Sequence, residues 1–379
     1  MAQGLDWLRE AAASGEVHTV RISFADRLGV WRGKRVPVDL FLGGVDKPLG
    51  FCDGMLVCDV HADLVQETRF SNYTTGYPDF YVHADPATIR QVGWAPAEAY
   101  VFGDLRDEHG HTTGVAARST LAKVAERAAA LGLTSVRLAV SGRLMHAPDR
   151  PATLELDLIH GAADRVLTTV AAGLDGAGIR VETIEVDRDG AFRLGLGSMG
   201  LRAAGEAGVV TKGAIKEVAR AAGLDATFMT RPLPGASPST WDVEVALPVG
   251  VVVDAGVLAA LAADARGLTS PSVTAFRAGP LSVEAGEGYA VVRASSEASP
   301  ETAVAIAVAC VAEAIAGTAG GAETVSLVDA ASRLESASWL SDWLGEDLPL
   351  NSAPLLRAEQ AMFDAAITDW ELQRYWKAS

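Results

Sequence analysis

Residues 224–246 read LDATFMTRPLPGASPSTWDVEVA and hold the pattern from which the fold can be argued. The short apolar run ATFM is typical of a strand, and Arg231-Pro232 after it leads into a loop rich in Gly, Ala, Ser and Pro. Apolar and acidic residues then alternate through 241–246, which predicts a second strand. This outline is typical of a loop that serves a nucleotide and a metal, yet the stretch contains no histidine. The sequence therefore raises the question of whether the segment belongs to a working active site.

The composition describes an acidic globular chain with room for two domains. Its 379 residues are 49% hydrophobic and 21% charged, and the net charge of −16 disfavours binding to nucleic acid or anionic membranes. Three cysteines are too few for a disulfide framework. The first residues lack the basic and apolar regions of a signal peptide, and the longest apolar run, 303–312, is too short to span a bilayer. We therefore expect a cytoplasmic protein with neither nucleic acid nor membrane as a partner.

The order of patterns along the chain predicts two domains. Short strand candidates fill residues 1–105, and the polar segment 106–114 is the expected linker. Residues 115–379 mix helices and strands without a strict alternation of the two. This mixture favours an α+β fold over a doubly wound parallel sheet.

Two patterns resemble ligand-binding signatures, but we interpret both as structural features. Residues 195–200, GLGSMG, match the G-x-G-x-x-G signature of dinucleotide sites. Two more glycines follow and would weaken the helix that this signature needs, so we expect a flexible loop there. Glu185, Asp187 and Asp189 alternate along one expected strand and share a face. A solvated acidic face is the preferred interpretation, with a hard-cation site as the alternative.

Several segments, taken in their order and spacing, resemble the glutamine synthetase family along nearly the whole chain. These segments are VRISFADRLGVWRGKRVP, DGMLVCD, GYPDFYVHADPATIR, GIRVETIE, KGAIKEVARAAGLDATFMTRP and ITDWELQRYW. The resemblance implies a small N-terminal β-grasp domain and a larger C-terminal domain with a curved antiparallel sheet flanked by helices. It also implies ATP-dependent joining of ammonia or an amine to a carboxylate, with Mg²⁺ or Mn²⁺ held by glutamates and a histidine.

Most positions that hold metal in the family carry other residues in this chain. The family's E-x-E-F resembles the segment 139–142, AVSG, and its E-x-G-P-G-Q-x-E falls on 187–194, which ends in Leu194 instead of an acid. The metal-binding histidine corresponds to Asp242 and the last metal-binding glutamate to Val291. Hard cations need clustered oxygen ligands, so no bound metal is expected.

The polar residues that remain define a candidate funnel. Its candidate residues are Asp187, Asp189, Arg231, Asp242, Glu244, Arg277 and Arg293. Asp187 and Asp242 are weak remnants of the metal site, and no residue is assigned a catalytic role. The side chains of Phe192, Leu194 and Trp241 would fill the funnel if they pointed into it.

The main prediction is a glutamine synthetase-like pseudoenzyme that keeps the fold and has lost Mg-ATP-dependent ligation. Such a protein would have a structural, regulatory or small-molecule-binding role and would need no cofactor. The alternative is an active ligase of the glutamine synthetase or γ-glutamyl-amine synthetase type with a reshaped site, which would use ATP with Mg²⁺ or Mn²⁺. The resemblance further implies a homo-oligomer, either a hexameric ring or a dodecamer, or co-assembly with an active paralogue. A small polar molecule is the other expected partner.

Overall fold

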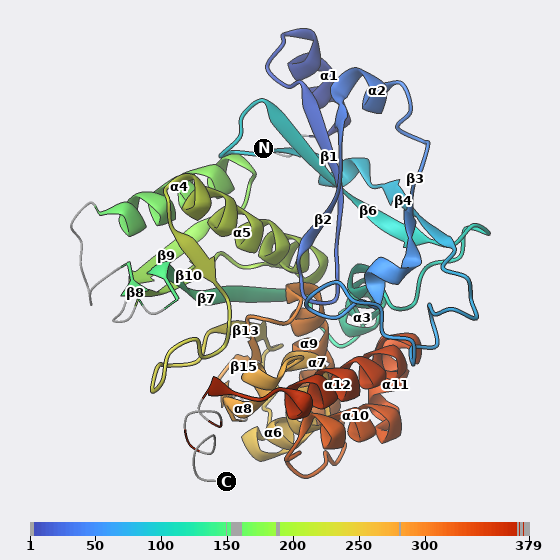
Figure 1. Cartoon of the computed structure of the whole chain (residues 1–379), viewed down its shortest axis with the longest axis vertical. Helices are drawn as coiled ribbons and strands as arrows, with labels where there is room; N and C mark the ends of the chain where they lie inside the picture. The colour runs from blue at the N-terminus through green and yellow to red at the C-terminus, as the bar shows by residue number, and fades with distance from the viewer. Residues whose placement is uncertain are drawn as a thin grey trace.

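Two β-sheets with helices packed on them form the protein (Figure 1). The computed structural model describes residues 4–148, 150–152, 161–186, 190–279, 282–369, 371 and 374. The N-terminal part is built on a six-stranded sheet and the larger C-terminal part on a nine-stranded sheet. The predicted α+β fold, with a curled sheet flanked by helices in the larger part, is confirmed.

The N-terminal sheet has the strand order β2-β1-β6-β4-β3, and β5 also pairs with β6. β1 and β6 run parallel, whereas the other pairs are antiparallel. β1 is almost entirely buried because it lies between two strands, and β2 is an exposed edge strand. The elements are α1 (Leu5–Ala13), β1 (Thr19–Ala25), β2 (Trp31–Pro37), α2 (Val38–Leu42), β3 (Leu49–Cys52), the 3₁₀ turn η1 (Asp53–Leu56), β4 (Asp79–Ala84), the 3₁₀ turn η2 (Pro86–Thr88), β5 (Arg90–Gln91) and β6 (Glu98–Arg106).

The C-terminal sheet is antiparallel and is centred on β7. Its strand order is β14-β15-β13-β7-β10-β9, and three short strands, β8, β11 and β12, also pair with β7. The strands are β7 (Ser135–Ala147), β8 (Arg150–Pro151), β9 (Val181–Val186), β10 (Ala191–Leu196), β11 (Met199–Gly200), β12 (Asp225–Thr227), β13 (Thr240–Ala246), β14 (Val283–Gly286) and β15 (Tyr289–Ser295). The helices are α3 (Ala117–Ala129), α4 (Ala162–Gly176), α5 (Leu201–Ala221), α6 (Ala255–Asp264), α7 (Arg266–Thr269), α8 (Val273–Arg277), α9 (Pro300–Ala316), α10 (Leu327–Ser336), α11 (Ser338–Leu344) and α12 (Asp347–Ala365).

The stretch at 224–246 folds into the predicted strand, loop and strand. β12 is shorter than the ATFM run suggests, since it ends at Thr227, and β13 covers the alternating residues. The predicted domain boundaries stay a prediction. β6 continues to Arg106 and α3 begins at Ala117, so the segment 107–116 connects the two sheets.

α9 is the central helix of the C-terminal core. Pro300 starts it, a residue that favours the first turn because its missing N–H is not needed there. Every residue from 300 to 312 is buried, since the helix is apolar on all sides and packs against α3, α5 and α6. Within the described ranges, no helix combines the length and the apolar character that crossing a bilayer requires.

The glycine signature at 195–200 does not form the predicted flexible loop. Gly200 caps the start of α5, a helix of 21 residues. A Cβ at Gly208 would lie 2.4 Å from the Pro300 side chain, and a Cβ at Gly205 would lie 3.2 Å from the backbone of α9. The glycines therefore let α9 approach α5, and this packing outweighs their intrinsic cost in a helix. The expected loop is wrong because tertiary contacts decide the conformation.

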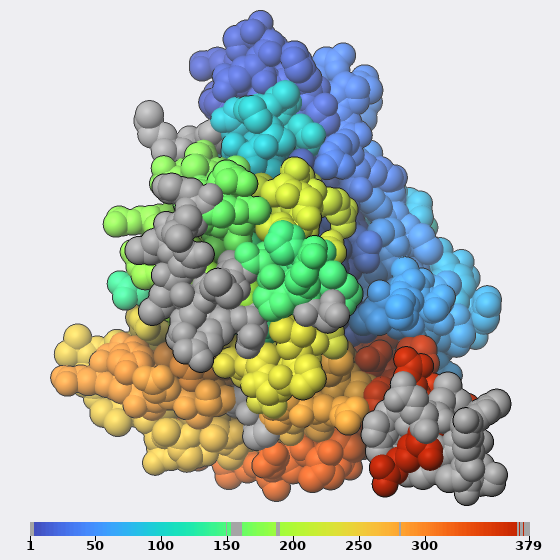
Figure 2. Space-filling view, turned by 60° about the vertical axis from the view of Figure 1, so that its left-hand side comes forward, coloured from blue at the N-terminus to red at the C-terminus, as the bar shows by residue number. Residues whose placement is uncertain are grey.

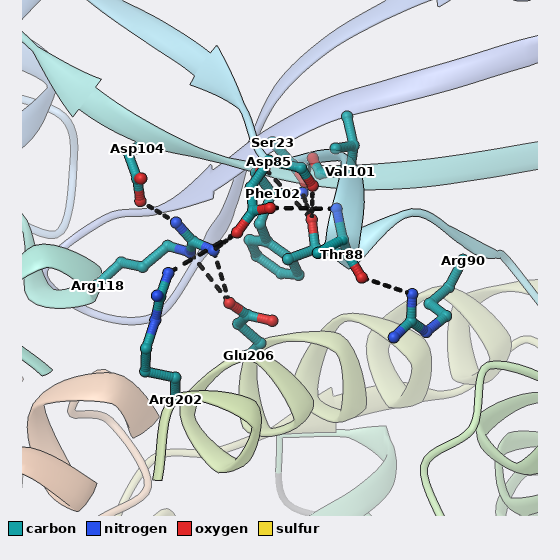
Figure 3. Close-up of polar contacts among 11 residues, drawn as sticks. Ser23, Asp85, Thr88, Arg90, Val101, Phe102, Asp104, Arg118, Arg202 and Glu206 are labelled. Carbon is teal, nitrogen blue, oxygen red and sulfur yellow. Dashed lines mark hydrogen bonds and ion pairs between the residues drawn. The ribbon is translucent and has the colours of Figure 1, made fainter. Parts of the chain in front are cut away.

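Arg118 joins the two parts of the chain through one buried guanidinium group (Figure 3). Its Nη2 lies 3.0 Å from Asp85 Oδ2 and 2.8 Å from Glu206 Oε1, and its Nη1 donates to Asp104. Asp85 and Asp104 belong to the N-terminal part, whereas Glu206 lies on α5. Burial raises the pKa of Glu206, and the charge of Arg118 opposes that shift. One cation thus holds three carboxylates from both parts of the molecule.

Glu301 is a buried acid in the first turn of α9, close to Arg118. Its side chain is 1% exposed, and neither carboxylate oxygen has a hydrogen-bond partner among the described residues. Burial raises the pKa of Glu301 to about 8, and the Arg118 guanidinium opposes this shift. Between its ordinary pKa of 4.5 and about 8, the folded protein keeps a proton that the unfolded chain releases.

Replacing Arg118 by Gln is expected to lower the free energy of unfolding by about 2–4 kcal/mol, because three carboxylates lose their shared cation. The partial solvation of Asp85 and Asp104 keeps this loss below that of a fully buried pair. Urea unfolding followed by circular dichroism measures the change. Arg9→Gln is the control, since it removes an exposed pair with Asp6 and should cost less than about 0.5 kcal/mol. Equal losses in the two variants would contradict the role of Arg118.

Stability is expected to fall as pH rises from about 4.5 to about 8, by at most about 1.4 kcal/mol per pH unit, because folding keeps the Glu301 proton. Glu301→Gln preserves the shape of the side chain and removes its titration, so this variant should lack the fall. Urea unfolding across that pH range measures both proteins. Glu126→Gln on exposed α3 surface should retain the wild-type slope. A wild-type slope in Glu301→Gln would assign the effect to another group.

Candidate active site

A cavity of about 340 Å³ opens on the face of the C-terminal sheet that points away from the core. Strand alternation produces it, because successive side chains point to opposite faces. On β13, Trp241 and Val243 are buried in the core, while Asp242 and Glu244 line the cavity. The charged lining residues are Arg137, Glu182, Arg193, Asp242, Glu244, Glu284 and Arg293.

Asp242 is the central charged group of this cavity. Sheet register places Arg293 of β15 directly opposite it. Arg193 Nη2 donates to Asp242 Oδ2 at 3.2 Å, and Arg293 Nε lies 3.5 Å from Oδ1. Thr240 Oγ1 donates to Oδ1 at 2.7 Å. The carboxylate therefore lies between two guanidinium groups and a hydroxyl, with its side chain only 15% exposed.

Each of the two arginines also contacts an acid farther from the centre. Arg293 Nη2 lies 3.4 Å from Glu284, which accepts a hydrogen bond from the Tyr289 hydroxyl at 3.0 Å. That hydrogen bond raises the pKa of Tyr289. Arg193 Nη1 lies 3.6 Å from Glu185. Cationic and anionic side chains therefore alternate across the cavity.

The described residues do not fit a divalent-cation site. Within the described ranges, no three His, Cys, Asp or Glu side chains are grouped so that they could hold a metal. The oxygens of Asp242 face arginines, and Ala139 and Val291, which line the same cavity, carry no side-chain oxygen. A hard cation needs several oxygen ligands at once. We therefore derive no chemical step through a metal.

The structure brings three of the predicted funnel residues together. Asp242, Glu244 and Arg293 all line the cavity, on the two adjacent strands β13 and β15. Asp187 and Asp189 lie outside the described residues, so their predicted place in the funnel stays a prediction.

Two other predicted residues lie away from this cavity. Arg231 is exposed in the loop between β12 and β13. Arg277 ends α8, where its guanidinium carbon lies 5.2 Å from the centre of the Phe363 ring. Neither arginine is among the residues that line the cavity.

The side chains that could have filled the funnel point into the core. Trp241 is fully buried, and its indole Nε1 donates to the carbonyl oxygen of Ala298 at 3.1 Å. Phe192 and Leu194 are buried on the core side of β10. The assignment of Leu194 to a position facing the funnel is therefore wrong. Arg193, its neighbour in the strand, has that position.

Six polar residues of the cavity were missed from the sequence: Arg137, Glu182, Thr183, Arg193, Glu284 and Tyr289. The period of two in 191–196, AFRLGL, could have placed Arg193 on the face opposite to the buried Phe and Leu side chains. Glu284 and Tyr289 carry no such local signal, since their place depends on the pairing of β14 with β15.

Comparison with known proteins relates the chain to ligases that join glutamate to an amine. A γ-glutamylethanolamide synthetase from Streptomyces coelicolor is 33% identical over 133 residues, which are 35% of this chain and 29% of that protein. A glutamate–isopropylamine ligase from a Pseudomonas species is 25% identical over 263 residues, which are 63% of this chain and 56% of the relative. The chain thus spans about half or less of the length of the curated relatives that it matches. No family model matches the sequence.

Solved structures share the fold over nearly the whole chain. Apo GmaS superposes with a TM-score of 0.77 at 20% identity and covers 97% of this chain and 98% of its own. A GmaS/ADP complex gives 0.78 at 19% identity, over 97% of this chain and 99% of its own. At these identities the likeness establishes the fold alone.

These findings correct two predictions made from the sequence. The relatives are named as ligases, and one solved neighbour carries ADP, so the predicted pseudoenzyme without cofactors is wrong. The alternative, an active ligase with a reshaped site, agrees better with the relatives. Missing carboxylates alone therefore do not predict loss of activity in this chain. The resemblance to the glutamine synthetase family is confirmed by these relatives and by the shared fold.

Proposed function

We propose that the chain is an ATP-dependent ligase that joins an amine to a carboxylate of glutamate or a similar acid. The observation that carries this proposal is the similarity to two ligases whose names pair glutamate with ethanolamine or isopropylamine. The cavity on the C-terminal sheet is the proposed site, since it combines arginines and acids over one open sheet face. The products would be an amide, ADP and inorganic phosphate.

Arg193 and Arg293 suit the acid substrate. A guanidinium group can bind a carboxylate through two parallel N–H donors, which fixes the orientation of the acid as well as its position. Both arginines contact Asp242, which holds their guanidinium groups on opposite sides of the cavity centre. In this proposal Asp242 is a positioning residue. The substrate carboxylate accepts hydrogen bonds from the guanidinium N–H groups that Asp242 leaves free.

Glu244 and Glu284 suit the amine. Their side chains are 41% and 50% exposed at the cavity, so they can attract a cationic alkylammonium from solvent. An amine must lose a proton before its nitrogen can attack, and a nearby carboxylate can accept that proton. The alternation of charges thus supports an acid held at the arginines with an amine beside it.

The nucleotide enters this proposal from the relatives, one of which was solved with ADP. ATP supplies the phosphoryl group that activates the acid. The described residues offer no carboxylate cluster for a metal, and the side chains of the cavity suit the acid and the amine.

A ligase assay tests the proposal. The full chain is incubated with glutamate, ATP, Mg²⁺ or Mn²⁺ and a panel that includes ammonia, ethanolamine and isopropylamine. We expect ADP release together with an amide detected by mass spectrometry, and loss of both on chelation. Arg293→Gln should lower kcat/KM at least about tenfold, because a charged hydrogen bond to the acid is lost.

Lys123→Gln on the exposed surface of α3 is the control and should retain the wild-type rate. Circular dichroism verifies that both variants are folded. Absence of an amide with every amine and both metals would overturn the proposed function. Equal rates for Arg293→Gln and the wild type would overturn the proposed site.

We also propose that the chain works as a homo-oligomer in the cytoplasm. β9 is an edge strand that is exposed along most of its length, and proteins usually cover such edges. The three cysteines, Cys52, Cys58 and Cys310, are all free thiols, as suits a reducing compartment. Light scattering at micromolar concentration should give a mass well above the 39.5 kDa of one chain. A monomer at that concentration would contradict the oligomer.

A further inference from the structure

A second cavity, of about 550 Å³, lies between β2 and α5. Figure 2 shows this side of the molecule, where the C-terminal part of α5 (yellow) stands beside the N-terminal part (blue). The cavity shares no lining residue with the candidate active site. It is therefore a separate feature of the fold.

The charge of this cavity is opposite to that of the chain. Its lining has six cationic side chains and one acid, Glu217, although the net charge of the chain is −16. The cationic residues are Arg21, Arg32, Lys34, Arg35, Lys216 and Arg220. Such a concentration of positive charge attracts anions.

Two acids at the inner wall are shared by two of the arginines. Arg21 is 8% exposed, and its guanidinium lies 2.5 Å from Glu98 and 2.7 Å from Glu217. Arg35 contacts the same two carboxylates at 3.2 and 3.6 Å. The Glu217 carboxylate also accepts a hydrogen bond from the Trp94 indole at 2.6 Å. Both acids are therefore already paired with arginines of the cavity.

Lys216 and Arg220 carry the uncompensated charge on the α5 side of the cavity. They lie four residues apart on α5 and so share one face of the helix. Neither makes an ion pair with a described residue, whereas Arg32 is paired with Asp26 at 2.9 Å. Burial and the cations Arg220 and Arg32 lower the pKa of Lys216, against the attraction of Asp26. Like charges at this spacing repel, and an anion between them relieves the repulsion.

The floor of the cavity is rigid. The six-membered ring of Trp31 packs over Gly213 of α5, where a Cβ would come within 2.7 Å of the ring. The guanidinium carbon of Arg21 lies 5.4 Å from the centre of the Trp31 ring. This packing holds the backbones of β2 and α5 and the Arg21 side chain in place, while Lys216 and Arg220 extend from the exposed face of α5.

We propose that this cavity binds a multiply charged anion of the phosphate type, such as pyrophosphate or the phosphate chain of a nucleotide. Phosphate oxygens accept several charged hydrogen bonds at once, which matches guanidinium and ammonium donors on two facing elements. The volume accommodates linked phosphates, whereas one singly charged carboxylate would compensate only one of the unpaired cations.

Isothermal titration calorimetry on the full chain tests the proposal with tripolyphosphate, pyrophosphate and inorganic phosphate. We expect affinity to increase with the charge of the anion and to weaken as salt is added. The double variant Lys216→Gln/Arg220→Gln should weaken tripolyphosphate binding at least about tenfold, because two charged contacts are lost. Lys47→Gln/Lys123→Gln removes the same charge elsewhere on the surface and should keep the affinity within about twofold.

Arg293→Gln separates this cavity from the proposed active site and should leave tripolyphosphate affinity unchanged. Equal affinities for ATP and tripolyphosphate would identify the phosphate chain as the ligand, and tighter ATP binding that is still lost in the α5 variant would identify a nucleotide. The proposal is overturned if tripolyphosphate does not bind at low salt, if both double variants lose affinity equally, or if Arg293→Gln alone abolishes binding. These outcomes do not depend on whether the protein shows ligase activity.

Discussion

The pairing of β7 is the constraint on which the C-terminal part depends. Five strands pair with this 13-residue strand, so its alternation sets the faces of the whole sheet. Val136, Leu138 and Val140 are buried in the core, while Arg137 and Ala139 face the cavity. A register shift of one residue would exchange the two sets and bury an arginine without a partner, at a large desolvation cost. The core and the proposed active site are therefore produced by the same pairing.

Charge compensation explains why the reshaped cavity is compatible with a stable fold. The carboxylate of Asp242 is only 15% exposed, and a carboxylate in such a half-enclosed place needs a cation. Arg293 supplies that charge from the adjacent strand β15, and Arg193 supplies it from β10, on the other side of β7. Guanidinium groups keep their charge at any ordinary pH and offer donors in several directions. They can therefore hold Asp242 and still present N–H donors to the carboxylate of the proposed substrate. A cavity that had only lost its function would not need these additional donors.

Local patterns predicted the parts of the structure that depend on neighbouring residues. The alternation in 241–246 placed Asp242 and Glu244 on one face of β13, and the mixture of elements identified the α+β class. The first half of the helix that follows 195–200 was missed, since this part of α5 is stabilised by α9, a segment about a hundred residues away in sequence. Arg193 was missed because the segment was matched by family positions, although the period of two pointed to it. Contacts such as those of Arg118 depend on how the two sheets meet and have no local signature.

The ratio of cations to neighbouring acids differs among three places in this acidic chain. Arg118 is surrounded by three carboxylates and is buried, so its surroundings account for it as a structural joint. In the proposed active site, acids slightly outnumber arginines, which suits substrates that carry both signs of charge. Of the Arg118 cluster, the proposed active site and the cavity between β2 and α5, only this cavity has a clear excess of cations. Although the net charge of the chain is −16, Lys216 and Arg220 make no ion pair with a described residue. A fold that keeps these cations one turn apart retains a repulsion that an anion removes, and this is the reason to interpret that cavity as a binding site.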